Sequence, residues 1–335
     1  MSKSLVIGVD IGHHSIKAVA LKPNGDNYSL YGCTEIVITD DIFADNDTLN
    51  YQKIVKKLKE LKKSFPLFSR KVAIALPDTA VISKVLQIDS DLDPREKEFA
   101  IYQAFSHQSP LPMEELSLDF VPLPIQAFAK NRTATYQVYA TRREVVASRL
   151  SAIQQAGLEA TLLDVQLHGL AQIWQQVSQA QQRSNWMLVD VGYTQTTLCI
   201  DFADKAPFYK DIALGTRWFE LPSLAETMAR SDERNQWLFN RLFVERLTRQ
   251  LQLFTSVHGQ QSLAGIWLSG GGAMMDGLAE TITEQLGLPC ERFAPLATFV
   301  NKITQRKRLN DQPKFTTAAG LALRGIAWLE SGHVA

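Results

Sequence analysis

The sequence predicts an α/β protein built from two related lobes, and three observations support this fold class. The chain has 335 residues, enough for two domains at roughly 100–200 residues each. One pattern (an apolar run, Asp, an apolar residue, Gly and a polar turn before another strand) occurs at residues 5–21 and again at 187–200. Strand and helix signals alternate in both halves, as in proteins whose helices cover a largely parallel sheet.

The composition limits the class of protein. The 35 Lys and Arg residues balance 35 Asp and Glu residues, so there is no overall field to attract nucleic acid, and no such partner is expected. Cys33, Cys199 and Cys290 lie far apart without a CxxC pair, which argues against a disulfide framework or a zinc site. No apolar stretch approaches the roughly 18–20 residues that cross a bilayer, and no signal-peptide pattern is found. We therefore expect a cytoplasmic protein.

The elements of the first half follow from their spacing. Residues 5–21 read as two strands joined by a turn. Residues 53–65 form a basic helix with apolar residues at helical spacing, and residues 72–76, before a proline, form a short buried strand. Residues 93–107 begin with Asp, Pro and a Glu three places after the Asp, which predicts a capped helix. A further helix is expected at 143–156, closed by a glycine.

The second half repeats the order of elements. Residues 187–200 match the first hairpin, and residues 235–258 form a long amphipathic helix. A strand at 266–269 enters three glycines, Gly270 to Gly272. We expect a helix directly after them, with Met275, Leu278, Ile282 and Leu286 facing inward and Gly287 at its end.

The position of the repeat divides the chain near residue 180. We expect a first lobe whose core comprises residues 1–80 and 163–182, and a second lobe of residues 183–335. Residues 81–162 have strand and helix signals of their own and are expected to form an inserted subdomain.

The two Asp-x-Gly hairpins predict a nucleotide site. Asp10 and Asp190 end equivalent strands and can orient the waters of a hydrated Mg²⁺, which keeps several waters and needs few protein ligands. Gly12 and Gly192 let each turn approach a ligand closely. Lys17 adds positive charge near phosphates. The polar turns supply N–H groups and hydroxyls for phosphate oxygens through His13, His14, Ser15, Tyr193, Thr194 and Gln195.

A third candidate element is the glycine-rich turn of Gly270, Gly271, Gly272 and Ala273, which lets backbone pack against an adenine or an α-phosphate. Each piece alone has a plainer interpretation. A single Asp-x-Gly hairpin is usually only a turn, and adjacent His13 and His14 fit a surface turn better than a metal site. The order of the motifs along the chain is more specific than any one of them.

The basic residues between positions 53 and 71 favour a solvated helix face that partly balances Asp40, Asp41, Asp45 and Asp47. Contact with a membrane surface is the alternative.

Other nucleotide and hydrolase motifs are absent from the sequence. It contains no GxxxxGK[ST] and no GxGxxG after a strand, so neither a P-loop nor a dinucleotide fold is expected. It has no GxSxG elbow of a serine hydrolase.

The segments 9–21, 188–200 and 267–291 resemble the actin-like ATPase superfamily and, within it, the PilM family of type IV pilus assembly proteins. The resemblance implies an actin-like fold of duplicated ribonuclease-H-like domains, with an inserted subdomain as in FtsA. It implies ATP and Mg²⁺ in the cleft, with the residues named above around the metal, phosphates and adenosine. It further suggests Gly215 beside the cleft, Glu226 at the ribose and Gln166 as the residue that positions an attacking water.

The resemblance also implies partners. The family partner is the cytoplasmic N-terminal tail of the inner-membrane protein PilN, bound between the first-lobe core and the inserted subdomain, with pilus motor ATPases and self-association as further options. We expect an ATP-binding scaffold with weak or no hydrolysis, because no catalytic base stands out. The alternatives are a small-molecule kinase of the same superfamily and a filament-forming protein of the FtsA type, although residues 325–335 do not resemble a basic membrane anchor.

Overall fold

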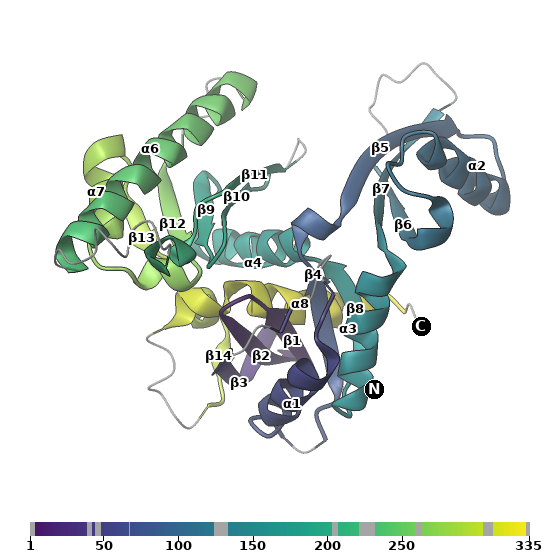
Figure 1. Cartoon of the computed structure of the whole chain (residues 1–335), viewed down its shortest axis with the longest axis horizontal. Coiled ribbons are helices and arrows are strands. Elements are labelled where there is room, and N and C mark those ends of the chain that lie inside the picture. Colours follow the sequence, from purple (N-terminus) through teal and green to yellow (C-terminus); the bar gives the residue numbers. More distant parts are fainter. Residues whose placement is uncertain are drawn as a thin grey trace.

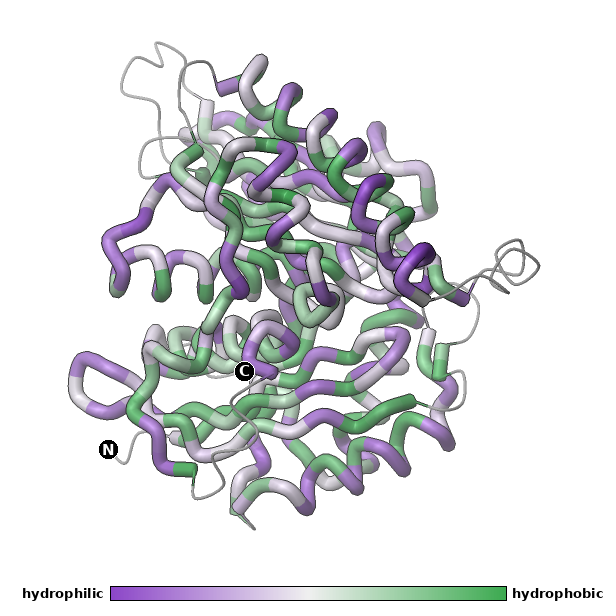
Figure 2. The backbone as a smooth tube through the Cα atoms, turned by 90° about the vertical axis from the view of Figure 1, so that its left-hand side faces the viewer, coloured by the Kyte–Doolittle hydropathy of each residue, from purple (hydrophilic) through white to green (hydrophobic). Residues whose placement is uncertain are grey.

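The structure is a computed structural model and describes residues 4–38, 42–43, 48–66, 68–123, 133–202, 207–220, 232–258, 263–303 and 311–332. Two sheet-containing lobes lie one above the other with helices between them, and a smaller unit projects from one side (Figure 1). Hydrophobic residues concentrate inside each half, and hydrophilic residues follow the outer helices (Figure 2). The α/β class predicted from the sequence is confirmed.

The first lobe contains a sheet in the order β14-β3-β2-β1-β4-β8. Two hairpins join β1 to β2 and β2 to β3, and β4 and β8 continue the sheet in parallel with β1. The strands are β1 (Val6–Ile11), β2 (Ser15–Asn24), β3 (Asn27–Val37), β4 (Lys71–Leu76), β8 (Glu159–Val165) and β14 (Val300–Asn301).

The sheet of the second lobe has the order β11-β10-β9-β12-β13. Hairpins again join its first three strands in sequence, and two parallel strands follow. The topology of the first lobe is therefore repeated, as the sequence pattern predicted. The strands are β9 (Trp186–Val191), β10 (Thr196–Ile200), β11 (Phe208–Ile212), β12 (Gly265–Ser269) and β13 (Cys290–Arg292).

Among the described residues, six α-helices cover these sheets. α4 (Gln166–Gln181) and α8 (Thr316–Glu330) pack together between the lobes, α1 (Tyr51–Lys62) and α3 (Arg143–Gln155) lie under the first sheet, and α6 (Asp232–His258) and α7 (Leu278–Leu286) lie outside the second (Figure 1). Successive strand residues point to opposite faces. Ile7 and Val9 of β1 accordingly join the core under α1 and α3, whereas Val6 joins the core around α4 and α8.

The projecting unit is a three-stranded antiparallel sheet with one helix. Its strands are β5 (Ile82–Asp89), β6 (Leu116–Pro122) and β7 (Thr133–Arg142), in the order β5-β7-β6. α2 (Pro94–Ser106) covers one face, and Asp93 caps it with the predicted capping box. The sequence division placed residues 143–162 in this unit, but α3 and β8 pack with the first lobe because β8 pairs with β4.

The prediction of a helix directly after the three glycines is wrong, because the helix begins several residues later. A short 3₁₀ turn, Gly271–Met274, follows β12, and α7 begins only at Leu278. Gly277 lies between them with φ of 70°, a left-handed conformation that breaks a continuous helix. Met275 therefore precedes the helix.

Candidate functional site

The two predicted hairpins have matching geometry. The Gly12 N–H donates to the Ser15 carbonyl at 3.1 Å, and the Gly192 N–H donates to the Gln195 carbonyl at 3.0 Å. In the strand register Asp10 lies opposite Lys17, and Asp190 lies opposite Thr197. Lys17 and Thr197 are therefore structurally equivalent, each beside one carboxylate.

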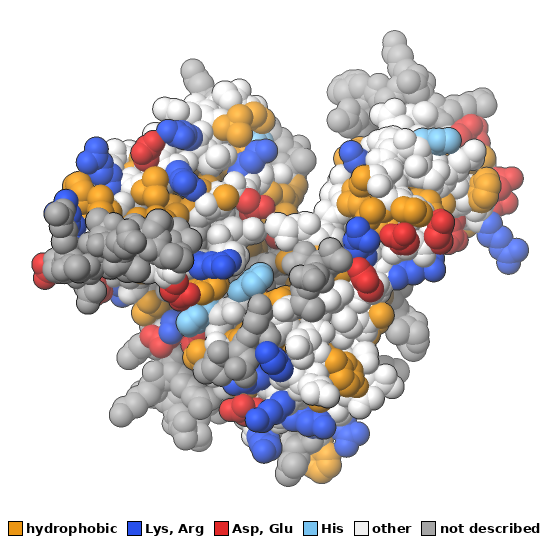
Figure 3. All heavy atoms as spheres, in the orientation of Figure 1, with side chains coloured by type: hydrophobic (Ala, Val, Ile, Leu, Met, Phe, Trp, Pro, Cys, Tyr) orange, Lys and Arg blue, Asp and Glu red, His pale blue; other side chains and the backbone are white. Residues whose placement is uncertain are grey.

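Both hairpin turns face a single cavity of about 460 Å³, a size that suits a nucleotide-sized ligand. Histidine side chains are visible near the centre of the molecule where the lobes meet (Figure 3). Of the predicted residues, the cavity brings together Asp10, Gly12, His13, His14, Ser15, Lys17, Gln166, Asp190, Gly192, Tyr193, Thr194, Gln195, Gly270 and Gly271.

Three predicted residues lie behind the lining and one cannot be placed. Gly272 and Ala273 are buried. Gly215 supports the second turn from behind, since the next residue, Thr216, donates its N–H to the Gly192 carbonyl at 3.0 Å. Glu226, the residue expected at the ribose, lies outside the described residues.

The two carboxylates are destabilised in their charged forms. Burial raises the pKa of Asp10 despite the opposing charge of Lys17 at 3.7 Å. Burial, with a smaller contribution from the charge of Asp10, raises the pKa of Asp190 to about 6, although Ser269 donates a hydrogen bond to it at 2.6 Å. A cation between the two carboxylates would relieve this cost.

The donor set fits Mg²⁺ and a triphosphate. Within the described part of the chain there is no group of three or more His, Cys, Asp or Glu side chains that could hold a metal ion, but a hydrated Mg²⁺ needs only a few carboxylates. Gly270 has φ of 80° and no room for a Cβ, which would lie 2.4 Å from the Val191 carbonyl oxygen. Gly270 is therefore required by its packing against β9. Gly271, which also lines the cavity, has open space where a Cβ would lie, and this leaves room for a flat base against the backbone.

The cavity also contains charged and polar residues that the sequence did not predict: Glu35, Thr79, Thr197, Thr216, Lys314 and Thr317. Ser15 donates to Glu35 at 2.7 Å, and Lys314 lies 3.5 Å from the other Glu35 oxygen. Glu35 lies opposite Lys17 on β3, so extending the hairpin register by one strand could have identified it. Lys314 comes from the far end of the chain and had no comparable signal.

Aromatic contacts close the rim of the cavity. His13 stacks on Phe43 with centroids 4.2 Å apart. His14 of the first turn meets Tyr193 of the second at 5.4 Å, and the Tyr193 hydroxyl donates to Glu220. The His14–Tyr193 contact therefore connects the two lobes across the cleft.

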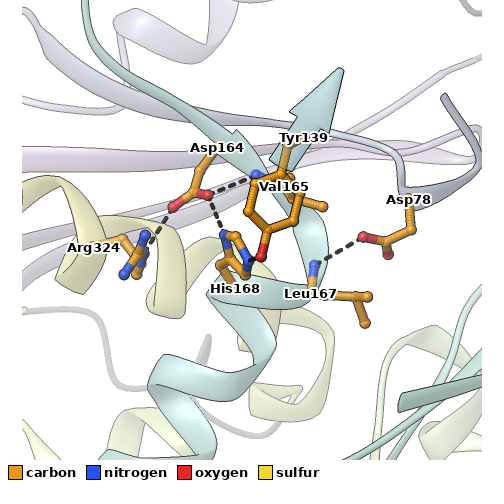
Figure 4. Close-up of polar contacts among 7 residues, drawn as sticks. All are labelled: Asp78, Tyr139, Asp164, Val165, Leu167, His168 and Arg324. Carbon is orange, nitrogen blue, oxygen red and sulfur yellow. Dashed lines mark hydrogen bonds and ion pairs between the residues drawn. The ribbon is translucent and has the colours of Figure 1, made fainter. Parts of the chain in front are cut away.

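Asp78 lies beside the start of α4. Its Oδ1 accepts the Leu167 N–H at 3.2 Å (Figure 4), while its Oδ2 is buried and has no hydrogen-bond partner among the described residues. Burial raises the pKa of Asp78 to about 7, and the nearby charge of Asp211 acts in the same direction. Gln166, next to Leu167, lines the cavity, so the first turn of α4 contacts the cavity on one side and Asp78 on the other.

A polar network joins α4 to three other elements (Figure 4). Asp164 at the end of β8 contacts His168 Nδ1 at 2.6 Å and accepts from Arg324 of α8 at 2.7 Å. His168 Nε2 lies 3.0 Å from the Tyr139 hydroxyl on β7. Burial acts to raise the pKa of Asp164, but the hydrogen bond and charge of His168 and the charge of Arg324 lower it overall. The inserted subdomain is thus connected to α4 and α8, the helices that lie between the two lobes.

No helix within the described ranges combines the length and apolar character that a membrane crossing requires.

Comparison with known proteins gives a family and a fold. The family model described as "Type IV pilus assembly protein PilM" matches residues 8–220 and 238–326. A chain of a "PilM-PilN type IV pilus biogenesis complex" is similar with a TM-score of 0.76 at 24% identity, covering 96% of this chain and 98% of that one. The ethanolamine utilization protein EutJ from Carboxydothermus hydrogenoformans gives 0.51 at 15% identity, covering 96% and 90%.

A glycerol dehydratase reactivase gives a TM-score of 0.55 at 11% identity, with 96% of this chain and all 100% of that chain covered. At sequence identities of 24% or less, these similarities show a shared fold and not a shared function. Together with the repeated sheet order, they show the actin-like fold that the sequence resemblance predicted.

Proposed function

The chain belongs to the family of the type IV pilus assembly protein PilM, and from this premise we propose that it is an ATP-binding scaffold that recruits a membrane-anchored pilus protein. In this proposal ATP and Mg²⁺ bind in the cleft and stabilise its closed form. A ligand shifts such an equilibrium only through its different affinities for the two forms. ATP bound in the closed cleft would contact both lobes, and these contacts would give the closed form the higher affinity.

One observation carries the nucleotide part: the two equivalent carboxylates and the glycine-containing turns of both lobes line a single cavity. Asp10 and Asp190 would hold the hydrated metal, which would neutralise phosphate charge. Lys17 and the N–H groups of the two turns would bind phosphates, and the backbone of Gly270 and Gly271 would pack against adenosine.

Little in the cleft supports rapid hydrolysis. Gln166 can orient a water at the cavity wall, but an amide cannot take its proton. Asp78 does not line the cavity, and its Oδ1 accepts the Leu167 N–H beside α4. We propose slow turnover or none, with nucleotide acting mainly on conformation.

The proposed partner is PilN, since the solved complex described above pairs a PilM with a PilN. The short cytoplasmic N-terminal tail of PilN would bind between the first-lobe core and the inserted subdomain and hold the protein at the inner membrane. Pilus motor ATPases would be further partners. The network of Asp164, His168 and Tyr139 lies at the root of that subdomain and offers a route by which the cleft influences the tail site.

Binding of a fluorescent synthetic PilN tail to the purified full chain tests the proposal. We expect saturable binding that changes in affinity when ATP and Mg²⁺ are added, and we expect Asp10→Ala to remove the nucleotide effect while retaining basal binding. Nucleotide binding is measured separately by calorimetry. Absence of tail binding by the intact protein, with or without ATP, would contradict the scaffold role.

A further inference from the structure

α1 and the loop after it form a strongly basic surface on a chain of zero net charge. Residues 51–71 contain eight Lys and Arg and one acidic residue, Glu60. This excess of seven positive charges is balanced elsewhere in the chain. A local excess of this size creates a field that extends about one Debye length, roughly 10 Å at 0.1 M salt.

The helix separates its apolar and basic residues. Ile54, Leu58 and Leu61 are buried against the first sheet, and Lys53, Lys56, Lys59 and Lys63 are exposed along the opposite side. Lys56, Lys59 and Lys63 line a shallow hollow together with Glu60, whose single negative charge leaves the hollow with a net positive charge of two. These three lysines form no ion pair with any residue that the structure describes, so their charges remain available to an external anion.

An exposed aromatic residue adjoins this surface. Phe68, in the loop that follows α1, is 93% exposed and lies two residues before the exposed Arg70. Basic side chains gather at the lower end of Figure 3, below the first sheet. A single exposed aromatic is common on protein surfaces, so Phe68 is informative here only because it adjoins the exposed basic residues.

We propose that this basic face, composed of Lys53, Lys56, Lys59, Lys63, Phe68 and Arg70, is a contact site for an anionic phospholipid surface. Its lysines extend over about 15 Å of helix, at 1.5 Å per residue, and together match a flat layer of negative headgroups. Phe68 can enter the boundary between headgroups and acyl chains. Proteins that bind single-stranded nucleic acid also combine basic and aromatic side chains, but they do so in a groove that follows the strand. Here the lysines lie along the outer side of one helix around a shallow hollow, an arrangement that suits a flat lipid surface better.

Such a contact would orient the protein on the membrane. It is independent of the nucleotide and PilN proposals, since none of its residues lines the cleft. Electrostatic attraction of this kind contributes most when a second attachment is present.

Cosedimentation of the full chain with vesicles tests the proposal. The vesicles contain phosphatidylcholine with about 30% phosphatidylglycerol, or phosphatidylcholine alone. We expect binding to the anionic vesicles at about 0.1 M salt and at least about tenfold weaker binding at 1 M, where the Debye length falls to about 3 Å. The triple variant K56E/K59E/K63E should bind at least about tenfold more weakly.

Two matched controls locate the effect. K84E/R95E/K210E changes the net charge equally with exposed residues elsewhere and should bind like wild type. Phe68→Ala should weaken binding severalfold, whereas Phe99→Ala, which removes another largely exposed aromatic, should not. Circular dichroism and the urea unfolding midpoint verify the folding of the α1 variant, and K56Q/K59Q/K63Q replaces it if that check fails.

The proposal is overturned if neutral vesicles bind equally well or if the control triple variant loses as much affinity as the α1 variant. It is also overturned if duplex DNA or polyglutamate binds the same lysines more tightly than the anionic vesicles.

Discussion

Gly169 of α4 and Gly320 of α8 meet backbone to backbone where the two central helices cross. A Cβ on Gly320 would lie 1.8 Å from the Gly169 carbonyl oxygen, a distance that no side chain can accommodate. The two helices lie between the sheets and contribute to the main core. Their separation, and so the relative position of the lobes, depends on this contact.

Gly320→Ala should therefore destabilise the protein even though alanine is the better helix former. We expect a loss of about 2–4 kcal/mol in the free energy of unfolding, because the clash involves backbone that cannot move aside. Urea denaturation measures it. Gly271→Ala is the contrasting variant: its Cβ would meet open space, so stability should be unchanged while ATP binding weakens. Equal stability of both variants would contradict the close crossing.

Asp190→Asn separates metal binding from folding. The amide removes a carboxylate whose pKa is raised from 3.8 to about 6, which corresponds to a cost on the order of 3 kcal/mol for the ionised form at neutral pH. The ligand-free variant should be as stable as wild type or more stable. Stabilisation by ATP and Mg²⁺, measured by thermal unfolding, should largely disappear. The control variant Asp89→Asn, at an exposed strand position, should still be stabilised by ATP and Mg²⁺.

The raised pKa values of Asp190 and Asp78, about 6 and about 7, predict a pH dependence. A carboxyl that holds its proton more tightly when folded stabilises the protein below its unfolded pKa, and this stability is lost as pH rises through the folded value. Ligand-free protein should lose part of its stability between about pH 4, near the unfolded pKa of 3.8, and about pH 7. Urea midpoints measured across this range should show a smaller loss for Asp190→Asn and for Asp78→Asn. Wild-type slopes in both variants would contradict the assignment.

Lys17 and Thr197 provide a comparison between equivalent positions. Lys17→Met removes the cation 3.7 Å from Asp10 and should weaken ATP binding at least tenfold, while adenosine affinity changes little. Thr197→Val removes a hydrogen bond of 2.7 Å to Asp211 and leaves the positive charge in place. Thr197→Val should weaken ATP binding severalfold at most. Calorimetry with ATP and adenosine distinguishes the two.

The sequence was most informative where local signals repeat. The Asp-x-Gly pattern and the alternating strands predicted both hairpins and placed their turns together, because equivalent strands of a duplicated fold end at equivalent positions. The capping residues of α2 predicted its start. Contacts between distant segments had no local signal: Lys314 reaches Glu35 from the other end of the chain, and α8 packs on the first sheet. The three glycines predicted a close turn, but Gly277 was not identified as the break before α7.

The contact between His168 and Tyr139 predicts how the inserted subdomain is held. Tyr139→Phe removes the hydroxyl that lies 3.0 Å from His168 Nε2 but keeps the ring contact between the two side chains. Hydrogen exchange should accelerate in β5 and β7 and remain unchanged in β9 and β12, because only the root of the subdomain loses a bond. Tyr136→Phe, on the same strand and without a recorded hydroxyl partner among the described residues, is the control. If the network transmits the state of the cleft, Tyr139→Phe should also reduce the effect of ATP on PilN-tail affinity. Normal exchange in the variant would show that packing alone fixes the subdomain.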